Sequence, residues 1–332
     1  MIRVGLLGTG RIGSLHAESI ASHRESTLTA VSDINDETAN KLAAQYGAIV
    51  KSADEIISDT NIDAILIATS TDTHSDFIEK AAAAGKAILC EKPVDLSLIR
   101  AKECLDKVSA AKNPIMVGFN RRFDPNFAQL KKSLDNGEIG NRELLTITSF
   151  DPAPPPISYV KISGGLYRDM MIHDFDLSNF IMGELPISIS AVGHSLVDPA
   201  IGVAGDVDTA VVTMVYADGK IAVIKNSRRA AYGYDQRIEI LGSEGLLQAE
   251  NILENSVVKS NNDGVISAKP KYFFLERYIG AFKAEWDAFL KSIHNHKPVP
   301  VTLKDGVAAL AMAEAATQSQ NTGKSIQLKE LL

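Results

Sequence analysis

The segment GTGRIG, residues 8–13, restricts the possible folds of this chain more than any other feature. It follows the apolar run IRVGLLG, which predicts a buried strand, and it opens a stretch with helical periodicity. A G-x-G-x-x-G sequence between a strand and a helix is typical of the turn that binds a dinucleotide pyrophosphate. Gly8 would permit the tight turn, Gly10 would let the pyrophosphate approach the backbone, and Gly13 would let the helix pack closely on the strand.

An acidic residue stands where such a motif needs one to bind a ribose. Asp33 lies 20 residues after Gly13, at the end of the second predicted strand. A carboxylate there accepts hydrogen bonds from ribose hydroxyls and repels a 2′-phosphate, so we expect NAD as the cofactor. Arg11 leaves weaker use of NADP open, because a guanidinium beside the ribose tolerates a phosphate; it could instead stack on the adenine or face solvent. A glycine turn without a nucleotide is the alternative to the whole motif.

Strand and helix patterns alternate through the first part of the chain. The predicted strands are the apolar runs at 2–8, 28–33, 62–69, 86–93 and 115–120. Segments with helical periodicity separate them, which predicts right-handed βαβ units and a parallel sheet buried on both faces. We therefore expect residues 1–120 to form an α/β NAD-binding domain of the Rossmann type.

After residue 120 the pattern changes. Alternating runs that predict strands, joined by short turns, lie at 143–150, 187–197, 208–216, 220–227, 236–242 and 245–250. They predict an open, mainly antiparallel sheet flanked by helices. One helix is expected from about residue 124 to 134, and two more near the end of the chain, the last beginning at a capping box of Thr302 and Asp305. Residues 121–332 are thus predicted to be a separate α+β domain whose sheet has a face to bury.

Composition excludes several classes of protein. The chain has 332 residues, a net charge of −7 and no run rich in Lys or Arg, so we expect no nucleic-acid or membrane partner. Its only two cysteines cannot make a disulfide framework or a zinc site, and no metal site is expected. We expect neither a signal peptide nor a membrane helix, because no run of about 18 apolar residues occurs. A reduced, cytoplasmic setting fits.

Two further segments follow predicted parallel strands at their carboxyl ends, where such sheets bind ligands. In ATSTDTH, Thr69, Ser70, Thr71 and His74 could line the cofactor, or the cluster could simply cap the next helix through Thr73.

In CEKP, Lys92 follows Glu91 directly after a strand. Its ammonium could bind a substrate hydroxyl and stabilise the alkoxide that forms as hydride leaves. A surface salt bridge at the strand end is the alternative.

The segment GGLYRDMMIHDFD, residues 164–176, places charge within an apolar, helix-like pattern. Asp169 and His173 are four residues apart and would share one face of a helix, with Asp176 on the same face and Asp174 pointing elsewhere. A carboxylate beside an imidazole raises its pKa and orients it, as a general base requires. A metal site or a hydrogen-bonded core histidine remains an alternative.

Taken together, GTGRIG, EKP and GGLYRDMMIHDFDL resemble the glucose–fructose oxidoreductase/inositol dehydrogenase (Gfo/Idh/MocA) family over essentially the whole chain. The segments GFNRRFDPNF, DPAPPPISY and YGYD look like its bacterial inositol 2-dehydrogenases. The resemblance implies NAD-dependent oxidation of a ring hydroxyl of myo-inositol to the inosose. It implies three catalytic residues: His173 as the general base, Asp169 to hold it, and Lys92 to bind the reacting hydroxyl.

Other site residues follow from the motifs and the resemblance. The expected cofactor-binding residues are Gly8, Thr9, Gly10, Arg11, Ile12, Gly13, Asp33, Thr69, Ser70, Thr71, His74, Glu91 and Lys92. The expected substrate-binding residues are Lys92, Arg122, Asp151, Tyr159, Arg168, Asp169, His173 and Tyr234. Each additional substrate residue has a structural alternative: a hinge for Arg122, a turn cap for Asp151 and core packing for the tyrosines. The resemblance also implies a homotetramer formed through the sheet of the second domain.

Three other functions stay open. The substrate could be another inositol isomer or a free aldose such as glucose or xylose. The chain could be a non-catalytic sugar or nucleotide sensor on the same fold, although a sensor has no need of Lys92, Asp169 and His173 together. A purely structural role is disfavoured, because buried charges between residues 168 and 176 would destabilise the protein without serving a function.

Overall fold

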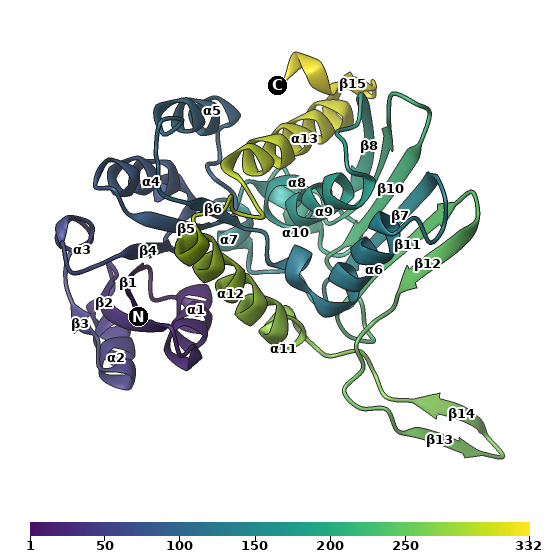
Figure 1. The fold of residues 1–332 in the computed structure, drawn as a ribbon. Helices are drawn as coiled ribbons and strands as arrows, with labels where there is room; N and C mark the ends of the chain where they lie inside the picture. Colours follow the sequence, from purple (N-terminus) through teal and green to yellow (C-terminus); the bar gives the residue numbers. More distant parts are fainter. The chain divides into compact units, whose positions relative to one another are not determined.

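The computed structural model describes residues 1–332 and contains two compact units (Figure 1). The first unit comprises Met1–Phe123 and Ala281–Leu310, and the second comprises Asp124–Gly280 and Ala311–Leu332. None of the helices combines the length and apolar character needed to span a membrane.

The first unit is built on a six-stranded sheet with the order β3-β2-β1-β4-β5-β6. All its strand pairs are parallel, as predicted. The strands are β1 (Ile2–Leu7), β2 (Ser26–Ser32), β3 (Ile49–Val50), β4 (Ala64–Ile67), β5 (Ala87–Glu91) and β6 (Ile115–Gly118). Because β1 and β4 are fully buried over most of their length, they read in the sequence as continuous apolar runs.

Helices connect these strands. They are α1 (Arg11–Ser22), α2 (Asp36–Tyr46), α3 (Ala53–Ser58), α4 (His74–Ala83) and α5 (Leu98–Lys107), with the short 3₁₀ turns η1 (Thr71–Thr73) and η2 (Asn120–Phe123). The short α3 and two-residue β3 are absent from the prediction, because neither is long enough to show a period. A capping box between Ser52 and Glu55 nevertheless marks the start of α3.

The second unit contains a seven-stranded sheet with the order β12-β11-β7-β10-β9-β8-β15. Its strands are β7 (Arg142–Phe150), β8 (Ser188–His194), β9 (Thr209–Val215), β10 (Ile221–Ser227), β11 (Asp235–Gly242), β12 (Gly245–Ala249) and β15 (Ile326–Gln327). The sheet is mainly antiparallel, as predicted, with β7 and β10 as its parallel pair. A separate hairpin, β13 (Val258–Asn261) with β14 (Gly264–Ser267), extends away from it (Figure 1).

Helices cover one face of this sheet. The helices α6 (Pro125–Asp135) and α9 (Ile172–Met182) pack against its strands. The short helices of this unit are α7 (Ile157–Val160), α8 (Gly165–Asp169), α10 (Pro199–Val203) and α11 (Phe274–Arg277). The last long helices are α12 (Ile279–Asn295) and α13 (Leu303–Thr322), followed by the 3₁₀ turn η3 (Leu328–Glu330). The predicted capping box forms, since Thr302 and Asp305 exchange backbone and side-chain hydrogen bonds of 2.6–3.2 Å.

Candidate active site

The glycine loop has the geometry that the motif predicts. Gly8 has φ +93°, and a Cβ atom on it would lie 2.3 Å from the carbonyl oxygen of Ala68. A Cβ atom on Gly13 would lie 2.0 Å from the carbonyl oxygen of Gly8, so α1 packs directly on the loop. Gly10 is the exposed N-cap of α1, has no side-chain cap, and has open space where a Cβ would be. The first amides of α1 are therefore accessible to a phosphate.

Asp33 follows β2 and is tied to this loop. Its Oδ2 accepts hydrogen bonds from the Thr9 amide at 2.6 Å and the Thr9 hydroxyl at 3.0 Å, and its Oδ1 accepts from the Asn35 amide at 2.9 Å. Burial opposes ionisation, but these hydrogen bonds outweigh it and hold the pKa of Asp33 below its usual value. A carboxylate has about four lone-pair positions, so this anion can still accept from ribose hydroxyls. Arg11 and Ile12 are the first residues of α1, and Arg11 is exposed.

The residues predicted after β4 have mixed environments. Ser70 and Thr71 begin η1, and the Thr69 hydroxyl pairs with that of Thr73 at 2.7 Å. His74 is only 1% exposed, and its ring nitrogens lie 2.8 Å and 3.1 Å from the carbonyl oxygens of Pro93 and Thr69. Burial lowers the pKa of His74. This geometry favours a structural role for His74 as a brace between two strand ends, whereas the helix cap through the Thr73 side chain does not form.

Glu91 ends β5 and is braced by a residue that the sequence analysis did not identify. Its Oε1 lies 2.7 Å from Nε2 of His16, which is buried on α1. Its Oε2 accepts a hydrogen bond from the backbone amide of Lys92 at 3.3 Å. The pair therefore links the dinucleotide helix to the strand end that presents Lys92. His16 lies three residues after Gly13, on the same buried side of α1 as Ala17 and Ile20, and this periodicity could have indicated its burial.

Arg122 lies in η2 and is occupied within its own unit. Its guanidinium donates to the Asp305 carboxylate at 3.0 Å and to the Pro300 carbonyl oxygen at 3.2 Å. These bonds engage Arg122 within its own unit, and both the hinge role and substrate binding by Arg122 remain predictions.

The helix predicted around Asp169 and His173 is interrupted, which corrects the sequence analysis. Asp169 is the last residue of α8, and His173 is the second residue of α9. Between them, the Met171 amide donates to the Leu166 carbonyl oxygen, one residue farther back than in an α-helix. The apolar period of this segment reflects burial of both short helices and does not require a continuous one. Both Asp169 and His173 are partly exposed, whereas their apolar neighbours are buried.

Asp169 is held by two side chains. Its Oδ1 accepts a hydrogen bond from the Tyr159 hydroxyl at 2.9 Å, and its Oδ2 lies 3.3 Å from Nη2 of Arg228. Tyr159 was predicted as a substrate residue, whereas Arg228 was not identified. Arg228 directly follows β10 and is 2% exposed. In the sequence, Arg228 is only an arginine at the end of an apolar strand. Many surface strands end with such a residue, so this pattern does not identify it.

Two predicted residues, Asp151 and Tyr234, lie with Arg228 at one end of the second sheet. Asp151 follows β7, Arg228 follows the parallel β10, and Tyr234 precedes the antiparallel β11, so all three lie at the same edge. The Asp151 amide donates to the Ser227 carbonyl oxygen at 2.9 Å. Tyr234 is 4% exposed and packs edge-on against Tyr278.

Asp174 contacts residues near the ends of β7 and β10 at this same edge. It is fully buried, and its two carboxylate oxygens accept hydrogen bonds from Ser149 and Asn226 of the sheet at 2.6 Å and 2.9 Å. This anchor fixes the start of α9, and with it His173, over the strand ends. The predicted Arg168, on α8, instead pairs with Glu314.

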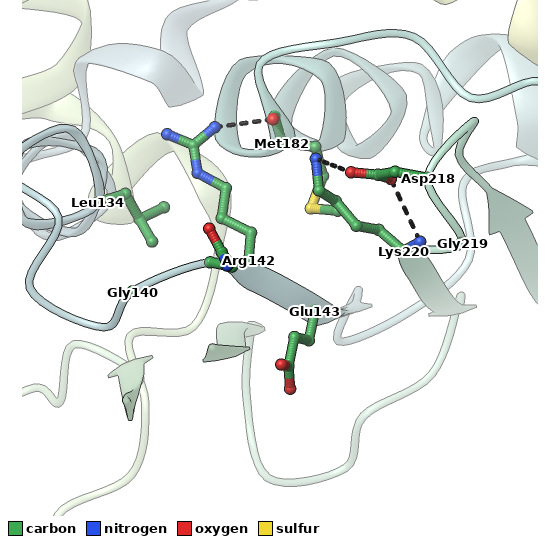
Figure 2. Close-up of a pocket in the computed structure, with 9 residues that line it drawn as sticks. Leu134, Gly140, Arg142, Glu143, Met182, Asp218, Gly219 and Lys220 are labelled. Carbon is green, nitrogen blue, oxygen red and sulfur yellow. Dashed lines mark hydrogen bonds and ion pairs between the residues drawn. The ribbon is translucent and has the colours of Figure 1, made fainter. Parts of the chain in front are cut away.

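A cavity of the second unit lies away from these residues. It lies beside the start of β7, with Arg142, Met182, Asp218 and Lys220 in its wall (Figure 2). Its volume is about 710 Å³. Lys220 is paired with Asp218 at 2.7 Å, and Arg142 donates to the Met182 carbonyl oxygen at 2.7 Å. Its cations are therefore neutralised or engaged, and none of the predicted site residues lines it. No group of three His, Cys, Asp or Glu side chains is arranged to hold a metal ion.

Comparisons with known proteins agree with both halves of this description. Residues 2–119 match the oxidoreductase family with an NAD-binding Rossmann fold, and residues 131–328 match the C-terminal α/β domain of the same oxidoreductase family. The inositol 2-dehydrogenase of Rhizobium meliloti is 46% identical, over 98% of this chain and 99% of that protein. The myo-inositol 2-dehydrogenase of Thermotoga maritima is 42% identical over the full length of both.

A solved structure adds information on ligands. The scyllo-inositol dehydrogenase of Lactobacillus casei, with bound NAD(H) and scyllo-inositol, is 30% identical and superposes with a TM-score of 0.92 over 99% of each chain.

Proposed function

This chain belongs to the glucose–fructose oxidoreductase/inositol dehydrogenase family, and from that premise we propose that it oxidises a ring hydroxyl of myo-inositol to the inosose with NAD. The observation that supports this best is the anchored carboxylate of Asp169 beside the start of the helix that bears His173. An NAD-binding unit alone would fit many reactions, whereas an anchored carboxylate four residues before a histidine fits removal of a hydroxyl proton.

NAD fits the residues of the first unit. The open backbone at Gly10 would receive the pyrophosphate, and the Asp33 anion would receive the adenosine ribose. When bound, NAD supplies the electrophilic nicotinamide carbon that accepts a hydride. The loop residues after β4 and β5 would complete the binding site.

In the proposed mechanism, His173 takes the proton of the reacting hydroxyl. A neutral alcohol is a poor hydride donor, so removal of this proton must accompany hydride loss. Asp169 orients the imidazole and stabilises the imidazolium that forms. Lys92 donates a hydrogen bond to the same oxygen and stabilises developing negative charge on it.

Recognition of a cyclitol needs several fixed polar groups. Asp151 and Tyr234, from neighbouring strand ends, are the candidates that the sheet geometry supports best. Arg122, Tyr159 and Arg168 remain in the proposal, although each already has a hydrogen-bonded or ionic partner within its own unit.

A second candidate is oxidation of another inositol isomer. The relative with bound scyllo-inositol supports it, because that protein shares the fold over nearly its whole length. Isomers differ in the orientation of single hydroxyls, so a few contacts would decide between them. Free aldoses remain a third possibility.

The test is NADH formation, followed by absorbance at mildly alkaline pH. The panel holds myo-, scyllo- and chiro-inositol, glucose, galactose and xylose, each with NAD and with NADP. The proposal expects the highest kcat/KM with an inositol and NAD. Activity with aldoses alone would change the substrate and keep the chemistry, whereas inactivity on the whole panel with tight NAD binding would favour a sensor.

We further propose a homotetramer in a reduced, cytoplasmic setting. Cys90 and Cys104 are free, buried thiols, which supports a reduced environment. Aliphatic side chains on the uncovered face of the second sheet support an assembly of several copies.

A further inference from the structure

We propose that Arg228 is a positioning residue for the reaction, which holds the Asp169 carboxylate in the orientation that His173 requires. This inference rests on the proposed function, because it assigns Arg228 a part in that proton transfer. Arg228 is not expected to touch the substrate, and it acts through Asp169.

The position of Arg228 is fixed by backbone structure. It directly follows β10, and its amide donates to the Asp208 carbonyl oxygen at 2.8 Å. Its side chain is 2% exposed, and its Nη2 lies 3.3 Å from Oδ2 of Asp169. A guanidinium removed from water in this way needs an anion close by, because an unpaired buried charge is strongly unfavourable. Asp169 is the anion that contacts it.

Asp169 needs such support because its helix ends there. The interruption between α8 and α9 means that Asp169 and His173 are not held by one continuous helix. Arg228 on one carboxylate oxygen and Tyr159 on the other restrain the carboxylate from both sides. A carboxylate held at both oxygens has less freedom to rotate away from an imidazole.

The charges around this pair explain why a cation is needed. Asp206, in the loop after α10, is a second acid near Asp169 and Arg228. Burial raises the pKa of Asp206, and the Asp169 charge adds to this, whereas hydrogen bonds from backbone amides and the Arg228 charge oppose it. Burial and the charge of Asp206 also raise the pKa of Tyr167 on α8. With Tyr159 neutral, Arg228 therefore compensates two neighbouring carboxylates.

The test compares Arg228→Met, which removes the charge, with Arg228→Lys, which keeps it. For Arg228→Met we expect kcat to fall by about 10- to 100-fold, with the KM for NAD unchanged. In the dependence of kcat on pH, the acid limb should move to higher pH by roughly 0.5 to 1 unit, because loss of a cation favours the protonated imidazole of His173. Arg228→Lys should keep the limb near its wild-type position. Tyr159→Phe, which removes a neutral donor, should leave the limb in place.

A double-mutant cycle distinguishes the proposed role from a loss of activity caused by defective folding. If Arg228 acts through Asp169, Arg228→Lys should reduce kcat in the wild-type background and have no further effect in an Asp169→Asn background. Equal reductions in both backgrounds, or an acid limb that does not move in Arg228→Met, would overturn the inference.

A measurement without turnover separates this inference from the proposed function. Nuclear magnetic resonance titration of labelled histidines, with His173 assigned from a His173→Gln variant, reports imidazole protonation directly. A wild-type enzyme that is inactive on the whole panel, but in which Arg228→Met shifts the His173 titration upward, would refute the proposed function and support the electrostatic link. An unshifted titration would refute the link even in an active enzyme.

Discussion

At the scale of single residues, His173 is the side chain whose replacement separates chemistry from cofactor binding. We expect His173→Ala to lower kcat by about 10²- to 10⁴-fold, because general-base catalysis supplies effects of that size. The Kd for NAD should change little, since Gly10 and Asp33 lie in the other unit. Stopped-flow kinetics and fluorescence titration measure the two quantities. The matched control is His194→Ala, an exposed histidine on β8. Equal losses of turnover and NAD affinity would contradict the role as base.

Asp33 is expected to determine the choice between NAD and NADP. We expect Asp33→Ser to lower the ratio of kcat/KM for NAD over NADP by about tenfold or more, because an anion that repels the 2′-phosphate is lost. Affinity for NAD itself should also fall, since Asp33 fixes the Thr9 amide in the loop.

The control for this change is Asp36→Ser, which removes an exposed acid at the start of α2. Steady-state kinetics with both cofactors gives the two ratios. An unchanged ratio in Asp33→Ser would mean that Asp33 does not bind the ribose.

We expect the buried carboxyl of Glu285 to make the stability of the folded protein depend on pH. It is fully buried on α12, and neither carboxylate oxygen has a hydrogen-bond partner. Burial, and then the charge of Glu91, raise its pKa well above the usual value. The folded state therefore keeps a proton that the unfolded state releases above about pH 4.3, so this carboxyl destabilises the fold increasingly as pH rises from there toward the raised pKa.

A glutamine at position 285 cannot ionise, so the Glu285→Gln variant should not lose stability in this way as pH rises. We expect the Tm of the variant, relative to wild type, to rise between about pH 5 and about pH 8. Calorimetry at several pH values measures the difference, with Glu37→Gln, an exposed acid on α2, as the control. A Tm difference that stays constant over this range would show that Glu285 is ionised in the folded protein.

Sequence reasoning identifies residues that belong to a local motif, and it misses residues whose role depends on contacts with distant segments. Gly8, Gly13 and Asp33 could be identified because their spacing along the chain reflects local geometry. Arg228 lies 59 positions from its partner Asp169, and His16 lies 75 positions from Glu91. Only the pairing of distant segments brings these partners together, and a single sequence contains no local sign of it.

At the scale of elements, the segment 165–182 shows a limit of periodicity. Its apolar spacing predicts one helix, but the backbone turns at Met170 and Met171 and begins a second one. Both short helices bury apolar residues, so the pattern continues across the interruption. Most strands of both sheets were predictable because two-residue alternation and buried apolar runs persist over their length, whereas the two-residue β3 and β15 are too short to show a pattern. The hairpin β13–β14 was not, because its residues are exposed and have no buried face.

The start of α6 depends on a buried ion pair between two elements. The N-cap Asp124 accepts hydrogen bonds from the amides of Asn126 and Phe127 through Oδ1, and Arg277 of α11 pairs with its Oδ2. Both charged side chains are 1% exposed. We expect Arg277→Met to lower the free energy of unfolding by about 3 kcal/mol, because it leaves a buried carboxylate uncompensated.

Urea unfolding of this variant should be compared with Arg229→Met, which removes an exposed arginine of the same unit. A loss below about 1 kcal/mol for Arg277→Met would show that Asp124 does not need its partner.

At the scale of the whole molecule, the sheet of the second unit has an uncovered aliphatic face. Leu144, Ile221 and Leu241 are neighbours in register on β7, β10 and β11, and each is about 40% exposed. Val211 and Val192 extend this surface across β9 and β8. Because the opposite face packs against helices, this face is available to another copy of the chain, and an aliphatic surface of this kind favours burial.

If the tetramer forms through this face, a charge at its centre should dissociate it. Ile221→Asp places a carboxylate between Leu144 and Val215, where a partner sheet would have to desolvate it without a cation. We expect sedimentation velocity at micromolar concentration to give a tetramer for wild type and a smaller species for the variant. Ile99→Asp, on the exposed side of α5 in the first unit, should remain a tetramer. A wild-type monomer, or an Ile221→Asp tetramer, would place the assembly surface elsewhere.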